Sequence, residues 1–173
     1  MFNHRRRGNA MIEFTLVGIP LMFLIVSVFE MSRGMWNYHT LQEAVKEGVR
    51  FEAVRGADLL NNSLVCSGNP DSCGASVNGI ATALSAAAIG IPPQYWNATL
   101  IAGTTSFTCA PVSSCLANTT QWPPTGNNTS GTPIEIFATY QFNSALAMFW
   151  PGSQPVSFST VTFAADSQQA IVY

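Results

Sequence analysis

The stretch RRRGNAMIEF, residues 5–14, opens an apolar run that decides how this chain is organised. No charged residue occurs from Phe14 to Phe29. With residues 9–13 the run reaches the ~20 residues that a helix needs to cross a bilayer core. Glu13 is the exception, a single carboxylate inside a segment otherwise suited to lipid, and a carboxylate at that depth is costly unless something pairs with it. The stretch therefore predicts a membrane helix with a functional acid near its start.

The charges on either side of the run predict its direction. Three arginines precede it: Arg5, Arg6 and Arg7. Only Arg33 follows closely, and segments rich in Lys and Arg stay on the cytoplasmic side, so we expect a cytoplasmic N-terminus. A cleaved secretory signal and a twin-arginine export signal share the basic start. Residues 30–36 are a poor candidate for a small-x-small cleavage site, and the helical pattern continues past them. Gly8 with an early carboxylate does not suit the twin-arginine signal, so we expect a retained anchor.

The remainder of the chain is polar without being basic. All seven Lys and Arg residues lie at or before Arg55, and only four acids follow Gly56. The first part therefore carries +2 (seven bases, five acids) and the rest −4 (four acids, no base). A surface that binds nucleic acid needs bases to neutralise phosphates. We therefore expect one exported domain after the helix, with no nucleic-acid partner.

The four cysteines fall in two close pairs: Cys66 with Cys73, and Cys109 with Cys115. Their spacings do not match the C-x2–4-C ligand pairs of structural zinc sites, and no histidine follows His39. An even number of cysteines in an exported domain favours disulfides over free thiols or a metal site. Three connectivities are possible, and the turn residues inside each pair favour Cys66–Cys73 and Cys109–Cys115.

The helical pattern continues beyond the membrane. Apolar residues recur at steps of three and four: Met31, Met35, Tyr38, Leu41, Val45, Gly48 and Val49. Such a stripe predicts one long helix over residues 9–56, with its membrane part at about 10–30 and a kink or looser turn at Pro20. We expect the outer half of the stripe to pack on the chain's own domain and the inner half on other subunits.

Residues 57–173 are expected to form the exported domain. A second helix fits the apolar spacing from Val77 to Ala88, and the polar segment 109–132 predicts an irregular exposed loop. Three strand-like runs are present: Ala98–Cys109, Pro133–Asn143 and Pro155–Ala165. In the middle run one face should carry the apolar residues: Ile134, Ile136, Ala138, Tyr140 and Phe142. Strands joined by loops predict an antiparallel meander.

The fold class predicted is α+β. A long N-terminal helix packs on a small domain with one short helix and an antiparallel sheet of three to four strands. An enzyme is not expected, because the only histidines are His4 and His39 and the exported domain has four scattered acids. No cofactor or metal is expected either. Trp36 and Tyr38 suit the membrane interface or the core equally well.

The N-terminal motif resembles the signal of class III type IV prepilins, and more closely that of the TadE-like minor pilins (pseudopilins) of tight-adherence pili. That family has a basic leader ending in glycine, then Glu as the fifth mature residue, an aromatic next, and often a helix proline. The corresponding residues here are Gly8, Glu13, Phe14 and Pro20. The segment LQEAVKEGVR, residues 41–50, resembles the family's stretch after the membrane. The match is specific from Arg5 to about Gly56.

The resemblance implies that residues 1–8 are a leader, which a prepilin peptidase cuts between Gly8 and Asn9. Asn9 departs from the family, in which the first mature residue is commonly small. The new amino group would neutralise Glu13 of its own or a neighbouring subunit, since a charge pair in hydrocarbon costs less than a lone carboxylate. Further implied partners are other pilin or pseudopilin subunits, the pilus assembly machinery and the lipid bilayer of the bacterial inner membrane.

The function implied is that of a non-catalytic structural subunit of the pilus. The alternative is a membrane-anchored extracytoplasmic recognition or adhesion module that does not enter a fibre. An uncut precursor would favour this alternative, and a mature chain that begins at Asn9 would favour the pilin.

Overall fold

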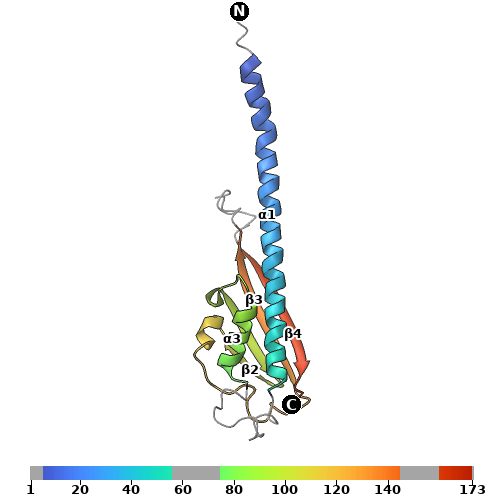
Figure 1. The fold of residues 1–173 in the computed structure, drawn as a ribbon, viewed down its shortest axis with the longest axis vertical. Coiled ribbons are helices and arrows are strands. Elements are labelled where there is room, and N and C mark those ends of the chain that lie inside the picture. Colours follow the sequence, from blue (N-terminus) through green and yellow to red (C-terminus); the bar gives the residue numbers. More distant parts are fainter. Residues whose placement is uncertain (1–5, 56–74, 145–159, 173) are drawn as a thin grey trace, which may run out of the picture. The chain divides into compact units, whose positions relative to one another are not determined.

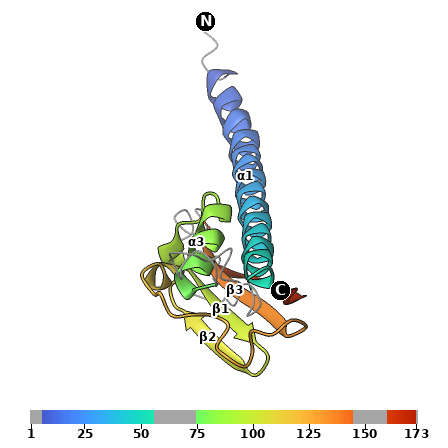
Figure 2. The same ribbon diagram turned by 60° about the horizontal axis from the view of Figure 1, so that its bottom comes forward.

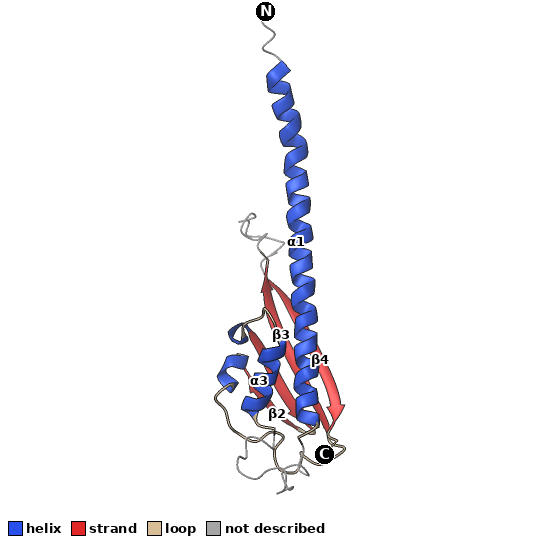
Figure 3. Cartoon of the chain, viewed as in Figure 1, coloured by secondary structure: helices blue, strands red, loops and turns tan. Residues whose placement is uncertain are grey.

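The computed structural model describes residues 6–55, 75–144 and 160–172, with the backbone alone for residues 6–10. Its helices are α1 (Arg6–Ala53) and α3 (Val77–Ala87), with short 3-10 helices η2 (Pro93–Tyr95) and η3 (Val112–Cys115). Its strands are β1 (Trp96–Ala102), β2 (Thr105–Cys109), β3 (Pro133–Asn143) and β4 (Thr160–Ala170). These elements make up the predicted α+β fold (Figure 1, Figure 3).

The chain divides into two compact units. Unit 1 comprises Met1–Met35 with Asn143–Thr160, and unit 2 comprises Trp36–Phe142 with Val161–Tyr173. Helix α1 contributes its apolar first part to unit 1 and its second part to unit 2. The division between the two units therefore falls inside one helix.

Helix α1 is longer at its start than we predicted, and it ends slightly earlier. It begins at Arg6, inside the predicted leader, and continues through Pro20 without interruption. Proline removes one backbone donor from a helix, and such a residue is common in membrane helices. The hydroxyls of Thr15, Ser27 and Ser32 donate to carbonyls of the preceding turn of α1. These polar groups are thus satisfied within the helix, as an apolar environment requires.

The sheet has the order β2-β1-β3-β4 and is antiparallel, but it is not the simple meander we predicted. The run Ala98–Cys109 is a hairpin of two strands, in which Ala102 lies opposite Thr105. Gly103 makes the tight turn possible with φ of +56°, a value that disfavours a residue with a side chain. Strand β3 then pairs with β1, so that β2 lies at the edge.

Strand β3 has the predicted bounds and alternation. Ile134, Ile136, Ala138 and Phe142 are buried, and Tyr140 packs half-buried beside them. Strand β4 lies later than predicted and extends to Ala170 rather than Ala165; residues 155–159 of the predicted strand lie outside the described part.

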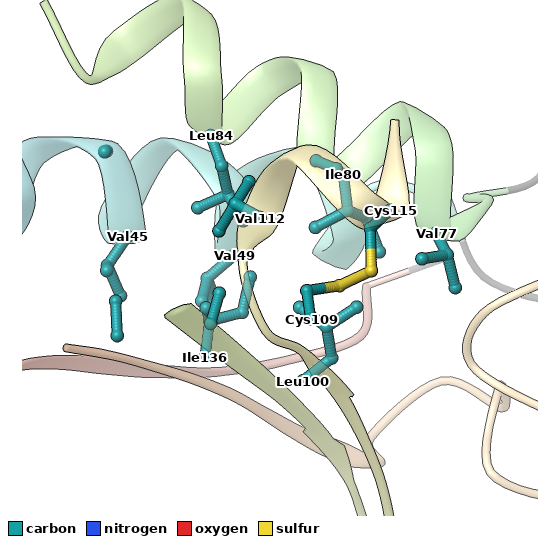
Figure 4. Packing of buried hydrophobic residues seen from close by; sticks show 14 of the residues in the cluster. Val45, Val49, Val77, Ile80, Leu84, Leu100, Cys109, Val112, Cys115 and Ile136 are labelled. Carbon is teal, nitrogen blue, oxygen red and sulfur yellow. A yellow bond between two sulfur atoms is a disulfide. The ribbon is translucent and has the colours of Figure 1, made fainter. Parts of the chain in front are cut away.

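The core of unit 2 lies between one face of the sheet and two helices. The second part of α1 and α3 both cover this face (Figure 1, Figure 2). Figure 4 shows Val45 and Val49 of α1 near Ile136, with Ile80 and Leu84 of α3 above them. Ser76 caps α3, because its hydroxyl accepts a hydrogen bond from the Gly79 amide at 3.1 Å. The opposite face of the sheet carries no described helix.

The segment 109–132 is more ordered than the exposed loop we predicted. It contains η3, and it buries Val112 and the indole of Trp122 in the core of unit 2. Its backbone is tied to the start of α3, since the Val77 amide donates to Thr120 and the Trp122 amide to Ala75. Its Pro, Ser and Asn content predicted irregular backbone correctly but concealed these buried anchors.

Candidate functional site

The residues of the predicted processing and assembly site lie at the start of α1. Gly8 and Asn9 are in its first turns, followed by Glu13 and Phe14. Both Glu13 and Phe14 are exposed, and 78% of the Phe14 surface is accessible. Asn9 precedes Glu13 by four residues, which is ~6 Å along a helix, and helical side chains lean toward the N-terminus. An amino group created at Asn9 would therefore lie within reach of the Glu13 carboxylate.

A shallow groove of about 370 Å³ lies on α1 beyond this point. Its floor is Gly18, where a Cβ would approach only Phe14, at 3.9 Å. Its lining is almost wholly apolar: Phe14, Thr15, Gly18, Ile19, Met22, Phe23 and Val26. Glu13 does not line the groove. An apolar groove with a glycine at its floor suits close approach of another helix or of lipid chains.

Among the described residues, α1 is the helix long and apolar enough to cross a membrane. No residue of its most apolar stretch is buried, and large side chains such as Leu16 and Phe29 are mostly exposed. The polar end of this stretch carries an ion pair, in which Arg33 lies 3.6 Å from Glu30. Arg33 also donates a hydrogen bond of 2.7 Å to the Asn143 carbonyl within unit 1. The apolar part of the helix thus ends at charged groups that are already engaged.

The second part of α1 is a packing element. Leu41, Val45 and Val49 are at most 1% exposed, as the outer half of the stripe predicted. A Cβ at Gly48 would lie 2.6 Å from Leu84 Cδ2 and 3.0 Å from Ile136 Cδ1, so the glycine allows α1 to approach α3 and β3. Met31 and Met35 are exposed, and no described contact tests whether other subunits cover them.

One buried carboxylate, Glu52, was not predicted from the sequence. Glu52 is fully buried, and neither of its oxygens accepts a hydrogen bond from another described residue. The pKa of Glu52 is raised to about 8, because the effect of burial outweighs the lowering by the indole N–H of Trp122. The Trp122 nitrogen itself has no acceptor within hydrogen-bond geometry, so we regard this contact as weak. The spacing could have predicted the burial of Glu52, because it follows Val45 and Val49 on the same apolar stripe of the helix.

One of the two predicted disulfides lies in the described part of the chain. Cys109 and Cys115 are joined with an S–S distance of 1.99 Å, and both are almost fully buried (Figure 4). The bond ties the end of β2 to η3. Cys66 and Cys73 lie outside the described residues, as does Arg5 of the predicted leader. Of Arg6 and Arg7 only the helical backbone is described.

Residues 8–50 match the family described as TadE-like protein. The N-terminal segment of this chain is TadE-like. The match begins at Gly8, the predicted last residue of the leader, and ends at Arg50, within the packing part of α1. The TadE-like segment therefore includes both Glu13 and the close-packed Gly48. No curated protein and no solved structure matches the chain significantly.

The described side chains also do not meet the requirements of a metal site. Along the described ranges, no three His, Cys, Asp or Glu side chains are grouped so that they could hold a metal ion. The start of α1 combines an apolar helix surface, the exposed carboxylate of Glu13 and a predicted cleavage position. Such an arrangement can anchor and align a helix.

Proposed function

We propose that this chain is a minor pilin of a tight-adherence pilus, a structural subunit anchored by α1 and processed by a prepilin peptidase. The observation that carries the proposal is that the TadE-like match starts at Gly8 and spans the uncovered apolar part of α1. In the membrane, Arg5–Arg7 would hold the uncut N-terminus on the cytoplasmic side. Unit 2 would then lie outside the inner membrane.

Cleavage between Gly8 and Asn9 would change the charge balance of the segment. It would remove three arginines and create one amino group a helical turn from Glu13. The pair formed by that amino group and Glu13 is less costly in hydrocarbon than the lone carboxylate. In this mechanism Glu13 sets the position of the subunit among its neighbours, and the Gly18 groove receives an adjacent apolar helix. The prepilin peptidase, other pilin subunits and the assembly machinery are the proposed partners.

The test is the mass of the mature N-terminus in cells that contain the pilus assembly genes. The wild-type chain should begin at Asn9, and Gly8→Phe should leave the full leader in place because a bulky residue blocks close backbone approach at the cut. Asn9→Ala is the matched control and should still be cut. A wild-type chain that begins at Met1 would overturn the proposal and favour a membrane-anchored recognition module.

A further inference from the structure

One face of the sheet in unit 2 is not covered by a described helix, and we call it the outer face. Successive side chains of a strand point to opposite faces of its sheet. In β1 the buried core residues Ala98 and Leu100 alternate with Thr99 and Ile101, which therefore lie on the outer face. The hydroxyl oxygens of Thr99 and Thr108 are 3.4 Å apart, so β2 contributes to the same face.

The middle of the outer face carries a row of two hydroxyls and one aromatic ring. Strand pairing places Thr99 of β1 between Thr108 of β2 and Phe137 of β3. Neighbouring strands are ~4.8 Å apart, so the row is ~10 Å long. Thr108 is exposed, and 39% of the Phe137 surface is accessible. The distance between the two hydroxyls is longer than a normal O–H···O bond, so both can still bond a ligand.

The rows on either side add polar groups without any positive charge. In one row Ile101 lies between Ser106 and Glu135, and in the other Asn97 lies opposite Thr139. No Lys or Arg follows residue 55, so no strand of the sheet contains a base. The outer face therefore offers one ring, several hydroxyls, an amide and a carboxylate, which together donate and accept hydrogen bonds.

This chemistry selects the class of partner. A polyanion needs bases, which the sheet does not contain. A second copy placed face to face would bring two acidic surfaces together, and its contact would lack the apolar centre of a protein interface. A neutral polysaccharide fits, because its C–H groups stack on an aromatic face and its hydroxyls bond to Ser, Thr, Asn and carboxylate groups. Oligosaccharides bind to sheet faces in OB-folds.

We propose that the outer face is a binding site for a neutral polysaccharide. The Phe137 ring stacks on one sugar unit, while Thr99 and Thr108 bond to hydroxyls of the sugar beside it, and Glu135 accepts a hydrogen bond from another hydroxyl. The site lies wholly within unit 2. It depends neither on cleavage at Gly8 nor on entry of the chain into a fibre.

The experiment measures binding of the full chain, in a detergent without a sugar headgroup, to beads of cellulose, chitin, dextran or mannan, with alginate and heparin beads as anionic controls. Phe137→Ala removes the ring, and Phe137→Tyr keeps it. Thr99→Val combined with Thr108→Val removes both hydroxyls but keeps the side-chain shape. Trp36→Ala is the matched control, because Trp36 is an exposed aromatic residue of unit 2 on α1, which packs against the opposite face of the sheet. Near-ultraviolet circular dichroism confirms that each variant is folded.

We expect the wild type to bind at least one neutral polysaccharide and neither anionic one. Phe137→Ala should weaken binding about tenfold and the double valine variant about fivefold, whereas Phe137→Tyr and Trp36→Ala should bind like the wild type.

Absence of binding to every neutral polysaccharide would overturn the proposal, and so would wild-type binding by Phe137→Ala. A loss in Trp36→Ala but not in Phe137→Ala would place the site on the helix side and overturn it as well. If Phe137→Ala instead dissociated an oligomer measured by light scattering, without polysaccharide binding, the outer face would be a contact between copies. None of these results changes the mass of the mature N-terminus, which tests the proposed function separately.

Discussion

The two parts of α1 use a similar apolar pattern in opposite ways. Before Met35 the large side chains are exposed and polar groups are few, whereas from Leu41 to Ala53 the same spacing is buried under α3 and the sheet. The difference follows from the residues that lie outside the apolar stripe. The second part alternates apolar residues with exposed Glu43, Lys46 and Arg50, but the first part is apolar on every side. A helix that is apolar on every side is stable when lipid or protein surrounds it, whereas a helix with one apolar stripe is stable when that stripe packs against a single surface.

Each part also contains a carboxylate among apolar residues. Glu13 is exposed in the first part, and Glu52 is enclosed in the second. Desolvation is the largest influence on the pKa of Glu52, and burial therefore favours its neutral form. In the proposed mechanism, cleavage creates an amino group at Asn9 that pairs with Glu13. One acid is thus accommodated by protonation, and the other by pairing in the proposed mechanism.

The largest effect is expected from removing the carboxylate of the first part. Glu13→Val should abolish entry of the subunit into the pilus or its assembly complex, measured by cross-linking of the membrane fraction, while cleavage at Gly8 continues. Charge pairing in hydrocarbon gives the reason. Glu13→Asp is the control that keeps the charge and should retain part of the incorporation. Full incorporation of Glu13→Val would show that Glu13 has no role in assembly.

A pair of glycine substitutions tests whether the two parts are packed differently. Gly48→Val should lower the free energy of unfolding of the full chain in detergent by about 3 kcal/mol, since its side chain would overlap Leu84 and Ile136. Gly18→Val meets only Phe14 and should leave that free energy nearly unchanged. Denaturant titration followed by near-ultraviolet circular dichroism measures both. Equal losses would contradict the contrast between the two parts.

The disulfide of unit 2 should make a smaller contribution. Replacing Cys109 and Cys115 together by serine removes a constraint on a short loop and should destabilise unit 2 by about 2 kcal/mol. The same titration of the wild type with and without reductant provides an independent measure. An unchanged midpoint in both would show that the bond is not needed to hold η3 against β2.

The pH dependence of stability tests the buried acid. Folding raises the pKa of Glu52 from 4.5 to about 8, so between these values the folded chain holds a proton that the unfolded chain has lost. The stability that the neutral acid contributes is therefore complete below pH 4.5 and is lost as the pH rises toward 8. The loss should reach at most about 1.4 kcal/mol per pH unit.

Glu52→Gln should flatten this pH dependence and stabilise the folded chain near pH 8, because an amide of the same shape carries no charge. Glu47→Gln is the exposed control on the same helix and should leave the slope unchanged. Unfolding midpoints between pH 5 and 8.5 give the comparison. A slope that persists in Glu52→Gln would assign it to another group.

Much of this molecule was predictable from patterns whose physical cause is local. The length of α1, the start of α3, the faces of β3 and the Cys109–Cys115 bond follow from apolar spacing, turn residues and cysteine pairing. The edge position of β2 was not predictable, because it depends on which strand β3 joins after a long loop. Trp122 was missed for the same reason, since only the tertiary fold brings it against Glu52. The site residues at Gly8 and Asn9 remain predictions.

The tie between the Val172 amide and the Ala53 carbonyl has a consequence for synthesis. Ile171 is also buried in the core that α1 begins, so unit 2 joins residues separated by more than a hundred positions. Such long-range contacts form late and slowly. If unit 2 is exported as proposed, the apolar stripe at the end of α1 stays uncovered until residue 172 has crossed the membrane. Under that proposal, the uncovered stripe is the surface that a chaperone outside the membrane would have to protect.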